Sequence, residues 1–351
     1  MSFIPCLEVF MNEYYFSLCG LHLQISSELP LTFVESVEEF LFPDRATFFA
    51  SLAQTPMWAR IQEDGMIGFA GNAPLRKCFF HYTVTSYPGV LPIPSNLVFD
   101  CFKFEIYEPG DQVVYRYRVG MDINPYHAVL TLAAKAQPYT GLDSGIEGLY
   151  VAEHTLQLPQ AENYAHLIAE QINFSSMIGF ETVNLWFQLI PMHAASVIAN
   201  GKAVLFTGPS GMGKSTQSNL WLQYLPTAPV NGDKTVLHIT EEDLTVYGSF
   251  YAGSSGIVHN VHAPLGAIIS LQQGPENTIR RLRPAEAYRK LYPRFLIPQW
   301  DRNVTAHVME MLQSLVTRIP VYELTCRPDR DAVELAYRTI FPDQEIQWKE
   351  Q

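Results

Sequence analysis

A glycine-rich octapeptide in the second half of the chain constrains its fold more than any other stretch. Residues 208–215 read Gly-Pro-Ser-Gly-Met-Gly-Lys-Ser, which completes the pattern G-x-x-x-x-G-K-S. An apolar run at 203–207 precedes it, and residues 215–225, which contain neither Gly nor Pro, follow it. This order predicts a buried strand, a tight loop and a helix whose positive N-terminal end faces the loop. Such a loop wraps a phosphate group in backbone N–H groups.

Each position of the octapeptide has a physical role in holding a nucleotide. Gly208, Gly211 and Gly213 lack a Cβ atom, so the backbone can curl closely around phosphate oxygens. Lys214 can bridge the β- and γ-phosphates of ATP, and the Ser215 hydroxyl can bind Mg²⁺. ATP and Mg²⁺ are therefore the predicted cofactors. The predicted nucleotide-binding residues are Gly208, Pro209, Ser210, Gly211, Met212, Gly213, Lys214, Ser215 and Thr216.

Composition and charge narrow the class of protein. The 351 residues are 48% apolar and 17% charged, which is typical of globular chains long enough for two domains. A formal net charge of −12 disfavours nucleic acid and anionic membranes as partners. No apolar run approaches the ~20 residues of a membrane-spanning helix. The densest basic group, Arg280, Arg281 and Arg283, is interpreted either as a solvated strand end or as an aid in holding an anionic substrate.

The cysteines and the N-terminus predict a cytoplasmic protein. The five cysteines are an odd number, they are widely spaced, and none forms a C-x-x-C pair. This pattern favours reduced thiols over a disulfide framework or a zinc site. The N-terminal residues do not predict a secretion signal, because no basic segment precedes an apolar core.

The first 160 residues are predicted to be rich in β-strands. Apolar residues alternate with polar ones at 21–26, and two further alternating runs at 102–106 and 115–119 flank Pro-Gly-Asp at 109–111. The latter pattern predicts a hairpin with one buried and one solvated face. Further strands are expected at 128–136 and 148–158, with a short helix at 34–41. A helical pattern between about 160 and 189 marks the predicted boundary between a domain at 1–160, for substrate recognition or an accessory role, and a nucleotide-binding domain at 161–351.

The second half predicts a sheet unlike that of doubly wound nucleotide-binding enzymes. Strands at 193–198 and 202–206 flank Asn200-Gly201, a strong hairpin signal, and strands at 235–239 and 244–247 form another predicted hairpin. A buried strand is expected at 265–271, and helices at 284–293, 303–318 and 329–340. Because the glycine-rich loop ends an antiparallel hairpin, the predicted fold class is α+β, with a mixed, largely antiparallel sheet and flanking helices.

Several segments in this half resemble a known family. They are Met192-His193-Ala194-Ala195-Ser196-Val197, the Asn200-Gly201-Lys202 turn, the glycine-rich loop and Asn231-Gly232-Asp233-Lys234. Their order resembles the catalytic domain of the HPr kinase/phosphorylase family and its phosphoenolpyruvate-carboxykinase-like relatives. Segments at 246–249, 252–255 and 281–287 are similar to HPr-kinase-like proteins found beside bacterial peptide-modification genes. The resemblance covers about residues 190–340.

The resemblance implies a kinase in which three residues are catalytic. Lys214 would hold the β- and γ-phosphates, Ser215 and Asp233 would bind Mg²⁺, and Asp233 or His193 would orient or deprotonate an acceptor hydroxyl. The acceptor would be a serine-like hydroxyl on a peptide, a protein or a small molecule. Since the N-terminal half does not resemble that of the HPr-binding enzymes, HPr itself is not the expected acceptor.

The chain also departs from the family at one catalytic position. The family carries two adjacent aspartates, whereas here Gly232 precedes Asp233. Two alternatives to a kinase therefore stay open: a nucleotide-gated binding protein with little turnover, and a phosphorylase acting on a phosphoserine. The sequence does not distinguish ATP from GTP, Asp233 from His193 as the base, or a monomer from a homo-oligomer.

Overall fold

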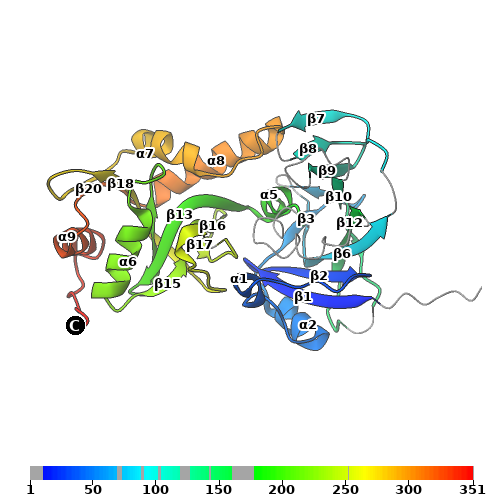
Figure 1. Ribbon diagram of the computed structural model, residues 1–351, viewed down its shortest axis with the longest axis horizontal. Coiled ribbons are helices and arrows are strands. Elements are labelled where there is room, and N and C mark those ends of the chain that lie inside the picture. The colour runs from blue at the N-terminus through cyan, green and yellow to red at the C-terminus, as the bar shows by residue number, and fades with distance from the viewer. Residues whose placement is uncertain are drawn as a thin grey trace, which may run out of the picture. The chain divides into compact units, whose positions relative to one another are not determined.

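The computed structural model describes residues 11–68, 73–87, 91–101, 104–118, 127–141, 144–159, 178–251 and 253–350 (Figure 1). The chain divides into two compact units, Met1–Phe180 and Glu181–Gln351. The predicted boundary at 160 and most of the helical pattern expected after it lie outside the described residues. Mixed sheets and flanking helices make the structure α+β. Among the described residues, no helix is both long and apolar enough to cross a membrane.

The first unit contains a large mixed sheet and a small one. In the large sheet the strands run in the order β1-β2-β6-β12-β10-β9-β8-β7, with β11 paired to β12; β2, β6 and β12 pair in parallel. Their bounds are β1 Asn12–Leu18, β2 Leu21–Ser27, β6 Cys78–Tyr87, β7 Leu97–Asp100, β8 Phe104–Tyr107, β9 Gln112–Arg118, β10 His127–Ala133, β11 Gln137–Pro138 and β12 Tyr150–Pro159. The small sheet comprises β3 Ala59–Ile61, β4 Ile67–Gly68 and β5 Leu75–Arg76, and the part of this unit up to residue 159 that the structure describes has the helices α1 Glu35–Glu38 and α2 Arg45–Gln54.

The hairpin predicted around Pro109-Gly110-Asp111 is confirmed, but its solvated face is wrong. Strands β8 and β9 pair antiparallel, and Arg116 lies opposite Glu105. Arg116, expected in solvent, is only 8% exposed and its guanidinium lies 2.9 Å from the Glu105 carboxylate. Period-two alternation identifies the strands, but a charged residue can occupy a covered face when it has a partner across the strand.

The second unit contains the predicted strands and helices of the C-terminal half. Its strands are β13 Leu189–Ala199, β14 Lys202–Thr207, β15 Ala228–Asn231, β16 Lys234–Ile239, β17 Leu244–Tyr247, β18 His262–Gln273, β19 Thr278–Arg281 and β20 Val321–Cys326. Its longer helices are α6 Lys214–Tyr224, α7 Pro284–Leu291, α8 Arg302–Arg318 and α9 Arg330–Ile340. Shorter helical segments are α5 Phe180–Val183, η1 Asn184–Phe187, η2 Gly253–Ser255 and η3 Tyr292–Arg294.

Five of these strands pair in a closed circuit. The order β14-β13-β16-β17-β18 returns to its start because β18 also pairs in parallel with β14. Strands β20 and β19 continue the sheet beyond β18, and β15 pairs with β13. Antiparallel pairs predominate, as the hairpin signals predict.

The turn at Asn200-Gly201 sets the register that brings the ends of β13 and β14 together. Both residues have positive φ, 49° and 71°, as a two-residue hairpin of the favoured hand requires. With this turn, Ala194 lies opposite Thr207, the last residue of β14. The Thr207 hydroxyl donates a hydrogen bond to the His193 carbonyl at 2.9 Å, so the glycine-rich loop begins beside His193.

Helix α6 is packed on one side by the sheet and held at its end by the C-terminal residues. Trp221 is fully buried between Phe206 of β14 and Tyr337 of α9. At the end of the helix, the backbone N–H of Lys349 donates to the Tyr224 carbonyl at 2.9 Å. These contacts fix the helix whose first turn carries Lys214.

Candidate functional site

The glycine-rich loop joins β14 to α6 as the sequence predicts. Gly208, Gly211 and Gly213 have φ angles of 154°, 79° and 96°, which residues with a Cβ atom rarely adopt. The carbonyl of Leu271 in β18 also lies close to Gly208, where an added Cβ would meet it at 3.3 Å. The loop tip at Ser210 and Gly211 is exposed, and Gln273 donates to the Gly211 carbonyl at 3.0 Å. Thr216 is exposed on the first turn of α6.

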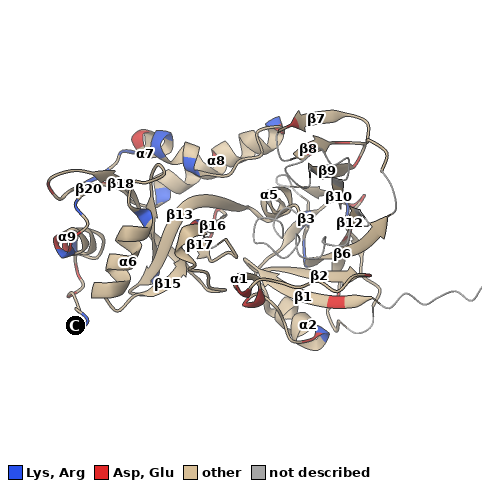
Figure 2. Cartoon of the chain, in the orientation of Figure 1, with Lys and Arg blue, Asp and Glu red and all other residues tan. Residues whose placement is uncertain are grey.

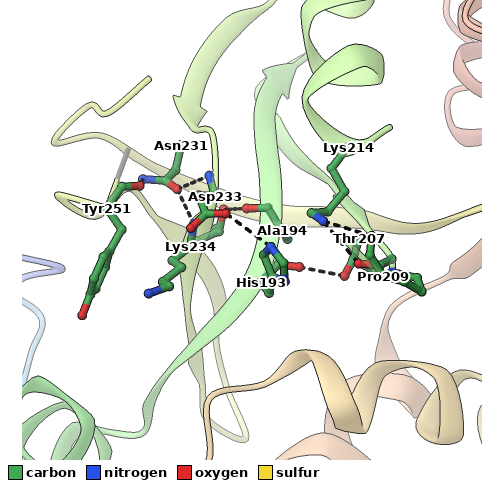
Figure 3. Close-up of polar contacts among 11 residues, drawn as sticks. His193, Ala194, Thr207, Pro209, Lys214, Asn231, Asp233, Lys234 and Tyr251 are labelled. Carbon is green, nitrogen blue, oxygen red and sulfur yellow. Dashed lines mark hydrogen bonds and ion pairs between the residues drawn. The ribbon is translucent and has the colours of Figure 1, made fainter. Parts of the chain in front are cut away.

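The Lys214 side chain folds back into this loop (Figure 3). Its ammonium donates to the carbonyls of Gly208 and Pro209, both at 3.3 Å, and the residue is 8% exposed. Burial lowers the pKa of Lys214, the nearby Asp233 raises it, and the charge of Arg294 lowers it further. A buried ammonium with only neutral carbonyl partners is poised to exchange them for an anion.

His193 and Asp233 form the second part of the site. The His193 Nε2 atom lies 3.3 Å from Asp233 Oδ1, and both side chains remain about one-third exposed, at 35% and 28% (Figure 3). A bulge in the pairing of β13 with β16 at His193 and Ala194 accompanies this contact, and the Ala194 N–H donates to the Asp233 carbonyl. The hydrogen bond from His193 lowers the pKa of Asp233 against the opposing effect of desolvation, helped by the charges of Lys234 and Lys214. The carboxylate is therefore ionised at neutral pH.

Asn231 builds the turn that carries Asp233. Its side-chain oxygen accepts hydrogen bonds from the backbone N–H groups of Asp233 and Lys234, at 2.9 and 2.8 Å. Its amide donates to the carbonyls of Ser249 and Tyr251, at 2.7 and 3.1 Å. Asn231 is 1% exposed, so these bonds are protected from water. In the Asn-Gly-Asp turn it is therefore the Asn231 side chain that stabilises the backbone, and the Asp233 side chain is available for other contacts.

A glycine- and serine-rich turn lies against Asp233. An added Cβ at Gly253 would stand 2.5 Å from the Asp233 Cβ atom, too close for any real side chain. In the same region the Lys234 ammonium lies 3.9 Å from the centre of the Tyr251 ring. In the sequence, residues 248–256 are rich in glycine and serine, but no pattern there predicts a contact with Asp233. The contact with Asp233 shows why glycine is required at 253.

The segment around Arg294 also reaches the site, which the sequence did not predict. Phe295 forms an isolated bridge with Met192, and the Leu296 N–H donates to the Pro191 carbonyl at 2.9 Å. This segment therefore runs beside the residues that lead to His193. The influence of Arg294 on the Lys214 ammonium follows from that placement.

The basic group near residue 280 is partly neutralised. Arg280 pairs with Glu323 at 2.9 Å and with Glu286 at 3.4 Å. Arg281 and Arg283 are exposed at the end of β19 and before α7, around which Figure 2 shows both basic and acidic segments. The pairing of Arg280 favours the interpretation of a solvated strand end.

The residues predicted to bind Mg²⁺ are few. The Ser215 hydroxyl makes no hydrogen bond among the described residues and is half-buried in the first turn of α6. The described part of the chain contains no group of three or more His, Cys, Asp or Glu residues placed to hold a metal. Cations that bind with one carboxylate need oxygens from elsewhere, and nucleotide phosphates are their usual source in magnesium sites.

Comparisons with known proteins give a distant structural similarity and no sequence match. No family model matches the chain, and no curated protein matches it. Among solved structures the chain is similar to the HPr(Ser) kinase/phosphatase from Coxiella burnetii, at 17% sequence identity. The alignment covers 44% of this chain and 88% of that chain, with a TM-score of 0.26. The function proposed next therefore rests on the residues of the site.

Proposed function

We propose that the chain is an ATP- and Mg²⁺-dependent kinase that transfers the γ-phosphoryl group to a serine-like hydroxyl. One observation carries the proposal: the glycine-rich loop that holds the Lys214 ammonium begins at Thr207, whose hydroxyl donates to the carbonyl of His193, the residue paired with Asp233. A phosphate-binding cation and an ionised carboxylate with its own hydrogen-bond donor thus belong to one site. Phosphoryl transfer needs chiefly positioning and charge neutralisation, and this arrangement supplies both.

The loop and Lys214 supply the nucleotide site. With ATP bound, the Lys214 ammonium would exchange the carbonyls of Gly208 and Pro209 for β- and γ-phosphate oxygens. The free N–H groups at the start of α6 and the helix dipole favour the same anions. The burial that lowers the pKa of Lys214 also makes an anionic partner favourable, because the ammonium has few water contacts.

Ser215 and Asp233 fit a magnesium ion that also takes phosphate oxygens. The Ser215 hydroxyl has no hydrogen-bond partner among the described residues, and the Asp233 carboxylate is ionised and partly exposed. One carboxylate and one hydroxyl, with phosphate oxygens and water, form a common ligand set for Mg²⁺. The bound ion would neutralise charge on the β- and γ-phosphates.

Asp233 is suited to take the proton of the acceptor hydroxyl. An ionised carboxylate only accepts hydrogen bonds, so in the contact with His193 the Nε2 atom is the donor. The acceptor oxygen would attack the γ-phosphorus, the bond from that phosphorus to the ADP oxygen would break, and the hydroxyl proton would pass to Asp233. His193 would hold the carboxylate in place.

The test combines nucleotide binding with turnover. Thermal unfolding is followed with and without ATP·Mg²⁺ in the wild-type protein, in Lys214→Ala and in the control Lys202→Ala, an exposed lysine on the neighbouring strand. We expect ATP·Mg²⁺ to stabilise the wild type and the control but not Lys214→Ala, since a ligand stabilises only the state that binds it. ADP release is then measured with free serine and with serine-containing peptides as acceptors. Equal ATP stabilisation of all three proteins would refute the assignment of the loop.

A nucleotide-gated binding protein is the second candidate. The observation that favours it is Gly232, which stands where a second carboxylate would precede Asp233. In this alternative ATP·Mg²⁺ stabilises the wild type, but no acceptor increases ADP release. The turnover measurement therefore separates the two candidates.

A further inference from the structure

The charges around Lys214 are unevenly balanced. The charges of Asp233 and Arg294 act on Lys214, and those of Lys214 and Lys234 act on Asp233. Three of these four groups are cationic and one, Asp233, is acidic. Asp233 already accepts a hydrogen bond from His193. Lys214 and Arg294 repel each other, and this repulsion destabilises the fold unless an anion binds near both cations.

Arg294 is held in this position by its backbone neighbours. The next residue, Phe295, bridges to Met192, and the Leu296 N–H donates to the Pro191 carbonyl at 2.9 Å. Residues 294–296 therefore lie alongside the part of β13 that ends at His193. These contacts hold the backbone of the segment and do not involve the Arg294 side chain.

The Arg294 side chain is not used to stabilise the fold. Among the described residues its guanidinium makes no hydrogen bond and no ion pair, although the residue is half-buried. By contrast, Arg280 and Lys290 in the same region both pair with Glu323. A half-buried guanidinium with five donors and no acceptor favours an anionic ligand with several oxygens.

We propose that Arg294 is a second cationic contact for the γ-phosphoryl group of the nucleotide, supplied from the segment between α7 and α8. This role rests on the proposed kinase function. Lys214 binds the β- and γ-phosphates from the loop, and Arg294 neutralises charge that develops on the γ-phosphoryl oxygens during transfer. Guanidinium groups in this role contribute strongly to the transition state and weakly to nucleotide binding.

The experiment compares three nucleotide states in four proteins. Affinities for ADP·Mg²⁺, ATP·Mg²⁺ and ADP·Mg²⁺ with aluminium fluoride, a mimic of the transferring phosphoryl group, are measured by calorimetry. The proteins are the wild type, Arg294→Gln, the charge-retaining Arg294→Lys and the control Arg289→Gln. Arg289 is an exposed arginine on α7, without an ion pair among the described residues. Thermal unfolding without ligand verifies that each variant folds.

In Arg294→Gln we expect the loss of affinity to increase with the negative charge at the γ-phosphoryl position. ADP affinity stays unchanged, ATP affinity falls about tenfold, as for one charge-assisted hydrogen bond, and affinity for the aluminium fluoride complex falls by about 10²–10³. Arg294→Lys recovers part of the last loss, and Arg289→Gln matches the wild type in all three states.

The alternative outcomes separate this role from the kinase proposal. If the wild type binds the nucleotides and Arg294→Gln shows no loss, or loses ADP and ATP equally, the role of Arg294 is refuted while the nucleotide site stands. If the wild type binds none of the three, the proposed function and the role of Arg294 fail together.

Discussion

At the scale of single residues, the proposed kinase chemistry depends on the pair formed by Asp233 and His193. The carboxylate is ionised because His193 donates to it and because the charges of Lys234 and Lys214 stabilise it. Both partners are partly exposed, so an acceptor hydroxyl could reach them. Their unequal roles, proton acceptor and positioning donor, can be separated by substitution.

We expect Asp233→Asn to keep nucleotide affinity within about tenfold while phosphorylation falls by at least ~10², because the carboxamide cannot take a proton and is a poorer magnesium ligand. His193→Ala removes a hydrogen bond to a charged group and should lower kcat by about tenfold. The measurements are calorimetry for binding and steady-state ADP release for kcat. If His193→Ala had the larger effect on kcat, His193 would be the base and Asp233 only a metal ligand.

These residues also show what a single sequence can reveal. The loop at 208–215 is contiguous, so the chemistry of each position could be predicted without knowing the rest of the fold. His193 and Asp233 are 40 residues apart; only the resemblance assigned both to one site, and their contact was not predicted. Arg294 lies 80 residues beyond Lys214, and no local pattern connects the two. Arg116 and Glu105 were expected in solvent because alternating apolar and polar residues identify a strand but do not show which charged side chains pair across it.

At the scale of elements, the turn between β15 and β16 is an organising feature. Asn231 connects the Asp233 turn to the segment at 249–251 through hydrogen bonds in both directions. Gly253, just beyond that segment, is pressed against Asp233. The position of the carboxylate therefore depends on a strand end and a turn that are joined through one amide side chain.

Asn231→Ala should loosen that connection. Hydrogen bonds to four backbone groups in a buried site are lost. Groups left without partners cost about 1–3 kcal/mol each, less where the segment can relax to water. We expect a lower midpoint in urea unfolding and a kcat reduced more than tenfold, with ATP affinity nearly unchanged because the loop is untouched. Asn219→Ala on the exposed face of α6 is the matched control. Loss of ATP affinity and kcat in equal proportion would indicate general destabilisation instead.

At the scale of the whole molecule, buried histidines make the stability of the first unit depend on pH. In Met1–Phe180, burial lowers the pKa of His154 to about 3 and that of His22 to about 4. The unfolded chain binds these protons near the ordinary histidine value of 6.5, whereas the folded unit does not. Stability is therefore complete above about pH 6.5 and falls as the pH drops toward the folded values.

Each buried histidine should cost at most about 1.4 kcal/mol of stability per pH unit within that window. We expect the unfolding temperature to fall between pH 7 and pH 5, and the fall to be smaller in His154→Gln, which does not titrate there. His262→Gln, at an exposed position, should behave as the wild type. The measurement is calorimetric unfolding at half-unit pH steps. An identical acid slope in His154→Gln would show that another group controls the transition.

The closed circuit of strands affects how the chain can fold while it is being synthesised. Strand β14 receives its second neighbour, β18, only when residues about 60 positions downstream have left the ribosome, since Val204 pairs with Ala267. Until then the apolar edge of β14 has no partner on that side, and the Leu271 carbonyl that lies against Gly208 is missing. Open apolar edges recruit other chains. A nascent chain paused between residues 207 and 262 would thus be prone to aggregate, and its glycine-rich loop would lack a contact that the complete fold provides.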